Sequence, residues 1–243
     1  MELKDKVALI TGSAGNGMGR SIALTLAREG AKIVVNYRTS KEAAENIVKH
    51  IESRDGEAIS VKADVFEADG CDNLVNAAME QFGRIDICVI NPGAGWHPET
   101  IDKLNSSDVI EDVRNEVAPF FHLMPLVFPQ MYKRKWGRII GISLLPPYES
   151  PAYSYNVAKA ARTQALLLGR DEAWRNGVTV NIISPGPVPA IENLSEAIEL
   201  CDHNPAWQNR NNTSPQDIAE SVAFLCSDAG RFISGCTVPF LFH

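Results

Sequence analysis

A tyrosine and a lysine four residues apart are the side chains whose chemistry is easiest to recognise. Tyr155 and Lys159 lie in a segment with helical periodicity over residues 151–176. Positions i and i+4 share one helix face, so the phenol and the ammonium can point into one site. A cation about 4 Å away, at an effective dielectric constant near 20, contributes on the order of 4 kcal/mol, enough to lower the phenol pKa by up to about three units. Tyr155 could then exchange a proton with a carbonyl or alcohol oxygen.

A glycine-rich turn lies between the first apolar run and the first helical segment. Glycines let the backbone approach a pyrophosphate, which then lies against free N–H groups at the positive end of a helix. An ordinary glycine turn of an α/β protein is the alternative interpretation. The turn spans Thr11–Gly19. Its predicted cofactor-binding residues are Gly12, Ser13, Asn16, Gly17, Met18 and Gly19.

The segment about 20 residues beyond this turn bears on which dinucleotide would bind. An NAD-binding protein usually presents an acid there to the adenosine ribose. Residues 36–41 contain no acid but include Arg38 and Ser40. A guanidinium can hold a 2′-phosphate in a bidentate fork, so we expect a preference for NADP(H), with NAD(H) possible. A solvated surface arginine is the alternative.

Apolar runs and helical segments alternate along almost the whole chain. The runs are apolar throughout, which is typical of a parallel sheet covered by helices on both faces. We therefore predict one domain over residues 1–243, a Rossmann-type doubly wound α/β fold, with a substrate loop at about 185–213. Predicted strands cover 7–11, 33–36, 58–62, 85–91, 138–143, 178–183 and 237–241. Predicted helices cover 18–29, 41–54, 66–82, 107–135 and 151–176, and a further one opens at 214.

Composition excludes several other classes of protein. The net charge is −7 and the only dense basic run is Lys133–Lys135, which argues against nucleic-acid binding. No apolar run reaches the roughly 20 residues that span a bilayer, and the charged N-terminus is unlike a signal peptide. The five cysteines are scattered, and Cys201 with His203 gives too few ligands for a metal site. We expect a cytoplasmic protein without a metal.

Together these features resemble the short-chain dehydrogenase/reductase family, in its compact branch of 3-oxoacyl reductase-type members. The resemblance covers nearly the whole chain. The matching pieces are Thr11–Gly19, Ala63-Asp64-Val65, Asn91 with Gly93, Asn115, Tyr155 with Lys159, and Pro185-Gly186.

The resemblance implies an oxidoreductase that moves hydride between the pro-S face of the nicotinamide and a carbonyl or alcohol carbon. It assigns the acid–base role to Tyr155, orientation of the substrate oxygen to Ser143, and a proton-relay water to Asn115. Lys159 would tune Tyr155 and hold the nicotinamide ribose. The remaining implied cofactor contacts are Asp64, Val65, Asn91, Gly93, Pro185, Gly186 and Val188.

Proline 119 bears on the relay. Pro119 has no N–H, so the carbonyl of Asn115 loses its helical partner, and we expect a kink there. A free carbonyl near Lys159 could hold the relay water.

The chain departs from the family pattern at several positions. The glycine turn is one residue longer, and proline replaces alanine at position 92. Ser143 lies 12 residues before Tyr155, one fewer than usual, and is followed by leucine. Either a local shift preserves the catalytic role of Ser143, or the role is lost and the serine only caps backbone groups. The usual threonine after Pro185-Gly186 is replaced by Pro187–Ala190, and the glycine-rich C-terminal ending is absent.

Two alternatives to a reductase follow from these departures. One is a nicotinamide-binding protein with little or no turnover. The other is a cofactor-independent lyase of the halohydrin dehalogenase type, against which the retained glycine turn and Lys159 argue. We expect a small-molecule partner and a homodimer or homotetramer joined through the apolar faces of the helices that carry Asn115 and Tyr155. Lys135 and Arg175 either dock an acidic carrier protein or are solvated charges.

Overall fold

Seven parallel strands form one sheet in a computed structural model, which describes residues 3–93, 99–144, 152–205 and 212–240. The strand order is β3-β2-β1-β4-β5-β6-β7, so the predicted doubly wound α/β class is confirmed. The strands are β1 (Val7–Ile10), β2 (Lys32–Tyr37), β3 (Ala58–Lys62), β4 (Ile87–Ile90), β5 (Gly137–Ile142), β6 (Val178–Ser184) and β7 (Thr237–Pro239).

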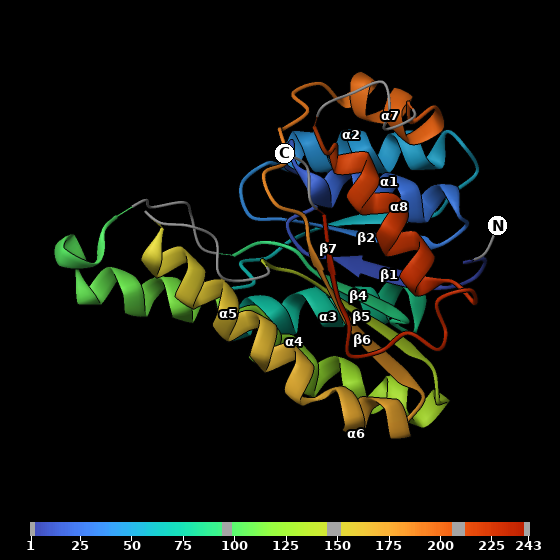
Figure 1. Cartoon of the computed structure of the whole chain (residues 1–243). Helices are drawn as coiled ribbons and strands as arrows, with labels where there is room; N and C mark the ends of the chain where they lie inside the picture. The colour runs from blue at the N-terminus through green and yellow to red at the C-terminus, as the bar shows by residue number, and fades with distance from the viewer. Residues whose placement is uncertain (1–2, 94–98, 145–151, 206–211, 241–243) are drawn as a thin grey trace.

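Helices cover both faces of this sheet (Figure 1). One face carries α1, α2 and α8, and the other carries α3, α4 and α5, with α4 and α5 side by side. The helices are α1 (Met18–Arg28), α2 (Lys41–Glu52), α3 (Ala68–Phe82), the short 3-10 helix η1 (Ile101–Lys103), α4 (Ser106–Arg134), α5 (Tyr153–Leu168), α6 (Arg170–Arg175), α7 (Leu194–Asp202) and α8 (Pro215–Cys226).

The central strands bury both of their faces. In β1, Ala8 and Ile10 belong to the core under α1 and α8, whereas Val7 and Leu9 belong to the core under α3 and α4. Successive side chains of a strand point to opposite sides, so a strand between two helical layers must be apolar at every position. This explains why the sequence shows continuous apolar runs instead of alternation.

The strand order reverses between β1 and β4, and this fixes the place of the site. From β1 the chain proceeds outward to β2 and β3, then crosses to β4 and proceeds in the other direction. The loops after β1 and β4 therefore diverge at the carboxyl edge of the sheet, where ligands bind in open α/β folds.

Two predicted segments differ from the structure. The helix expected over 151–176 is divided at Gly169 into α5 and α6, because glycine weakens a helix and the acids Asp171 and Glu172 favour a new helix N-terminus. The predicted substrate loop contains the helix α7. By contrast, α4 continues through Pro119 as a single helix, so the kink expected there does not end it.

Candidate active site

The glycine turn between β1 and α1 is held from behind by hydrogen bonds. The hydroxyl of Ser13 donates to the carbonyl of Ile10 at 2.8 Å and is buried, so Ser13 shapes the turn from within. The side chain of Asn91, after β4, donates to the carbonyls of Thr11 and Gly12 at 3.2 and 3.3 Å. The loop after β4 therefore fixes the first residues of the turn.

Asn36, at the end of β2, is a positioning residue that the sequence analysis did not identify. Its side-chain oxygen accepts from the Gly12 N–H at 2.9 Å, and its amide donates to the carbonyl of Ala63 at 3.1 Å. One side chain thus ties the ends of β1, β2 and β3 together. The available signal in the sequence was an asparagine near the end of an apolar strand. Such a residue is buried, and a buried amide needs hydrogen-bond partners.

The glycines of the turn divide into packed and open positions. A Cβ at Gly19 would lie 2.6 Å from the Gly12 carbonyl oxygen, so α1 can approach β1 only with glycine there. Gly12 has a φ of +60°, which also favours glycine. A Cβ at Gly15 or Gly17 would meet nothing within 4 Å. The outer part of the turn is therefore open in front of the first turn of α1, and a dinucleotide pyrophosphate fits there.

A pocket of about 310 Å³ continues from the turn along the ends of β2 and β3. Arg38 and Asp64 line it, with Nη1 of the arginine 3.7 Å from Oδ2 of the acid. The arginine side chain is 64% exposed, so the guanidinium is available to a ligand. Val65 and Gly93 complete the same pocket.

The loop after β6 touches the glycine turn. The Asn16 side chain donates to both carboxylate oxygens of Glu192 at 3.1 Å, and the Asn16 carbonyl accepts from the N–H of Ile191 at 2.8 Å. The residue that makes this turn longer than the family pattern is therefore the one that contacts the predicted substrate loop.

The other residues predicted to contact the cofactor lie at the start of α1 and just after β6. Met18 is partly buried against the core, and so is Val188. Pro185 is buried, and Gly186 has a φ of +67°, so the chain turns sharply just beyond β6.

Tyr155 and Lys159 lie together on α5, at the carboxyl edge of β5. The lysine Nζ is 5.3 Å from the centre of the tyrosine ring, and the lysine is buried while the tyrosine is half-buried. Burial and the neighbouring Arg162 guanidinium lower the pKa of Lys159 to about 8, against the opposing influence of Glu116. The predicted spacing thus does bring the two side chains together.

The pKa of Tyr155 moves in the direction opposite to the prediction. Burial raises it, the Glu116 carboxylate raises it further, and Arg162 offsets part of this rise. The spacing along the helix identifies Lys159 but not Glu116, the acid that is ion-paired with that lysine. Tyr155 therefore holds its proton more firmly than an exposed tyrosine.

Ser143, two residues before the undescribed segment 145–151, points toward α5. Its hydroxyl donates to the carbonyl of Lys159 at 3.0 Å and lies 2.8 Å from Oγ1 of Thr163. The side chain is buried. Of the two interpretations left open by the sequence, this geometry favours a serine that fixes α5 against β5.

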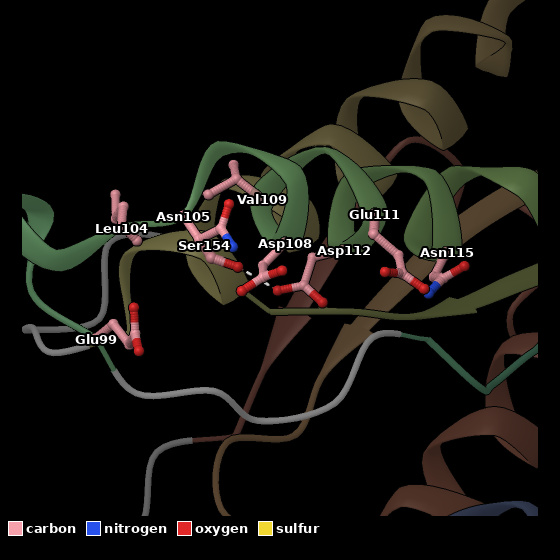
Figure 2. A pocket seen from close by; sticks show the side chains of 9 residues that line it. All are labelled: Glu99, Leu104, Asn105, Asp108, Val109, Glu111, Asp112, Asn115 and Ser154. Atoms are coloured by element: carbon pink, nitrogen blue, oxygen red, sulfur yellow. Dashed lines mark hydrogen bonds between the residues drawn. The ribbon is translucent and has the colours of Figure 1, made fainter.

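Asn115 faces a second pocket, of about 360 Å³, between α4 and the start of α5. Figure 2 shows Asp108, Glu111, Asp112 and Asn115 projecting from one side of α4, with Asp112 hydrogen-bonded to Ser154 of α5. Asn115 is thus on the side of α4 that faces the tyrosine helix, one residue before Glu116. Trp96 and His97 follow β4 and Tyr148 follows β5 in the sequence, and all three lie outside the described residues.

The two candidate carrier-docking residues lie away from this site. Lys135 lies two residues before β5 and donates to the side chain of Asn176 at 2.9 Å, and Arg175 precedes β6. Both are therefore near the amino edge of the sheet, opposite the edge that carries Tyr155. Among the described residues no cluster of potential metal ligands is found, and no helix is long and apolar enough to span a membrane.

Comparison with known proteins agrees with the fold and identifies the family. A family model described as enoyl-(acyl carrier protein) reductase matches residues 12–240. A 3-oxoacyl-[acyl-carrier-protein] reductase from Staphylococcus epidermidis is 31% identical over 243 residues, covering 96% of each chain. The chain belongs to the short-chain dehydrogenase/reductase family. Membership of this family makes it an oxidoreductase of the NAD(P)-dependent class.

Two solved structures show the same fold over almost the whole length. A short-chain dehydrogenase from Burkholderia cenocepacia, in complex with NADP, is 25% identical with a TM-score of 0.83, covering 99% of this chain and 98% of that chain. A 7α-hydroxysteroid dehydrogenase, complexed with NADH and 7-oxo glycochenodeoxycholic acid, is 29% identical with a TM-score of 0.85, covering 98% and 94%. These relatives thus include complexes with each of the two nicotinamide cofactors.

Proposed function

We propose that this short-chain dehydrogenase/reductase reduces a carbonyl group of a small molecule, with NADPH as its preferred cofactor and Tyr155 as the proton donor. The observation that carries the proposal is the placing of Tyr155 beside a buried lysine at the carboxyl edge of the sheet. The raised pKa of Tyr155 supports an acid more than a base at neutral pH.

The chain's own contribution to the reaction follows from these contacts. A bound reduced nicotinamide would supply the hydride to the carbonyl carbon. The O–H bond of Tyr155 breaks as its proton passes to the carbonyl oxygen, which gives the alcohol, and water then restores the proton to the phenolate. The Lys159 ammonium stabilises the transient negative charge, because opposite charges attract strongly in a site shielded from water. In the same proposal Asn115 supports a proton-relay water.

The residues that would hold the cofactor are those at the open part of the glycine turn and in the pocket beside it. Gly15, Gly17 and the N–H groups at the start of α1 suit a pyrophosphate. Arg38 suits a 2′-phosphate, and Asp64 and Val65 suit the adenine. Asn91, Gly93, Pro185, Gly186, Val188 and Lys159 are proposed for the nicotinamide half.

A nicotinamide-binding protein with little turnover is the second candidate. The inward-pointing hydroxyl of Ser143 favours it, because that hydroxyl does not extend toward Tyr155. Cofactor binding does not separate the two candidates, and turnover does.

Self-association is part of the proposal. Ile110, Phe121, Val157 and Leu168 are large apolar side chains on α4 and α5 that are between 38% and 79% exposed. Exposed apolar side chains on neighbouring helices support an interface there, and a twofold dimer or a tetramer would cover them. Carrier docking through Lys135 and Arg175 is not included, because both lie at the opposite edge of the sheet.

The deciding experiment measures cofactor binding and turnover separately. The purified protein is titrated with NADPH and NADH, and NADPH oxidation is then followed with ketones, quinones, 3-oxoacyl thioesters and a 7-oxo bile acid. We expect Tyr155→Phe to lower turnover by about 10²- to 10⁴-fold while cofactor affinity is retained. Tyr153→Phe, an exposed tyrosine on the same helix, is the matched control and should keep its activity. Binding without turnover over the whole panel would favour the second candidate.

A further inference from the structure

A buried carboxylate connects the reactive lysine to a buried arginine. Glu116 of α4 is fully buried, with Oε1 2.9 Å from Nζ of Lys159 and Oε2 2.8 Å from Nε of Arg162. The lysine and the arginine are one turn apart on α5. The acid therefore bridges two cations across the α4–α5 contact.

Arg162 anchors this acid to the ends of two strands. The arginine is fully buried and donates to the carbonyls of Glu116 at 2.9 Å, Ile142 at 2.8 Å and Asn91 at 3.4 Å, and to that of Pro92. A guanidinium out of water needs such partners, since an unpaired buried charge costs several kcal/mol. The arginine therefore has a fixed position relative to β4, β5 and α4.

The loop after β4 is shaped to admit the carboxylate. A Cβ at Gly93 would lie 2.2 Å from Oε1 of Glu116, so any other residue at position 93 would displace the acid. Gly93 also lines the proposed cofactor pocket. The Glu116 carboxylate thus lies at the edge of the proposed cofactor pocket, where it is ion-paired with Lys159.

We propose that Glu116 is a positioning residue that holds the Lys159 ammonium beside Tyr155 and keeps the phenol in the protonated form that donates to a carbonyl oxygen. This inference rests on the proposed function and deepens it. It keeps the free site in the form that reduces a carbonyl at neutral pH, because alcohol oxidation requires the phenolate as a base. Glu116 acts through Lys159 and Tyr155 and is not assigned a contact with substrate.

The charges around Tyr155 support this role. Glu116 raises the pKa of both Tyr155 and Lys159, and Arg162 opposes it in both cases. Further out on α4, Glu111 and Asp112 line the neighbouring pocket, and Asp112 is bonded to Ser154. His97 and Glu149 fall in segments 94–98 and 145–151, which lie outside the described residues.

Removing the charge of Glu116 should move the titration of this cluster. In Glu116→Gln the net charge around Tyr155 and Lys159 becomes more positive by one unit. Whichever of these two groups loses its proton first should therefore lose it at lower pH. We expect a shift of about one pH unit or more. The basic limb of the kcat profile for carbonyl reduction should move to lower pH by a similar amount. At pH 7 the ratio of kcat for alcohol oxidation to kcat for carbonyl reduction should rise.

Asp86 offers a matched control. It too is a fully buried carboxylate near two arginines, with Oδ1 2.6 Å from Nη2 of Arg84 and 3.5 Å from Nη2 of Arg134. It lies just before β4, at the opposite edge of the sheet. Asp86→Asn should reproduce the loss of a buried charge and leave the titration of Tyr155 and Lys159 unchanged.

The primary readout is a titration without cofactor. Proteins labelled with carbon-13 in tyrosine and lysine are titrated by NMR, and the signals are assigned with Tyr155→Phe and Lys159→Met. A shift in Glu116→Gln that is absent from Asp86→Asn is the expected result. Equal titrations in Glu116→Gln and the unmodified protein, or an equal shift in Asp86→Asn, would overturn the inference.

The kinetic arm separates this inference from the proposed function. If the unmodified protein reduces no carbonyl, the proposed function fails, whatever the NMR titration shows. If reduction occurs and the pH profile of Glu116→Gln is unchanged, the inference alone fails. Should Glu116→Gln not fold, Glu116→Asp keeps the charge but draws it back by one methylene from Lys159, and a smaller shift in the same direction is expected. An unshifted titration in Glu116→Asp under those conditions would overturn the inference.

Discussion

Replacing Arg38 with glutamine tests the cofactor preference directly. Arg38 lines the pocket at the ends of β2 and β3, and its guanidinium is mostly exposed beside Asp64. The substitution keeps much of the length of the side chain and removes its charge. We expect weaker binding of NADPH and little change for NADH, which has no 2′-phosphate.

The size of the effect can be worked from this exposure. Two unit charges about 4 Å apart interact by about 1 kcal/mol in water, and a phosphate monoester carries about 1.5 to 2 negative charges near pH 7. Arg38→Gln should therefore cost about 2 kcal/mol, which is about 30-fold in the Kd for NADPH. Asp64 remains in the pocket and opposes the phosphate.

Calorimetric titration with NADPH and NADH measures both constants. Arg54→Gln removes another partly exposed arginine, bonded to Asp202 at 2.6 Å, and should leave both constants unchanged. Salt should reduce the NADPH preference of the unmodified protein, because it screens exposed charges. An unchanged Kd for NADPH would show that Arg38 is a solvated surface residue. Equal losses for the two cofactors would show that the turn itself had been distorted.

Three further predictions concern packing and assembly. Gly93→Ala places a Cβ against the Glu116 carboxylate and should lower the free energy of unfolding by about 1–3 kcal/mol, measured by chemical denaturation. The control Gly15→Ala adds a Cβ with nothing within 4 Å and should change that free energy by less than about 0.5 kcal/mol. Ser143→Ala should lower the free energy of unfolding by about 1–3 kcal/mol and kcat by less than about tenfold. A loss of about 100-fold in kcat at unchanged stability would instead show that the hydroxyl contacts the substrate. Phe121→Glu, at a side chain that is 57% exposed, should dissociate the proposed oligomer in sedimentation analysis, and an unchanged mass would exclude this face as the interface.

Elements whose signal is local could be predicted from the sequence. Continuous apolar runs alternating with amphipathic segments are set by burial on both faces of a parallel sheet, so the fold class followed from them. The Tyr155–Lys159 pair also depends only on helical spacing, and the two side chains do lie together. The single helix expected over 151–176 was wrong because one glycine and two acids divide it at Gly169.

Residues joined across long separations could not be predicted in this way. Asn36 reaches Gly12 over 24 positions, and Arg162 reaches the carbonyl of Glu116 over 46. Read along the chain, these side chains are isolated polar residues with no periodic signal. Only the packing of β2 beside β1, and of α5 on α4, gives each of them its partner.

The sequence by itself therefore determined the layered α/β fold, the glycine turn and the tyrosine–lysine pair, because each depends on the pattern within a few turns of chain. The tertiary structure alone decided the charge around that pair. It brings a carboxylate from α4 and a guanidinium from α5 into one water-poor contact, where electrostatic forces are strong enough to reverse the expected shift in the pKa of Tyr155.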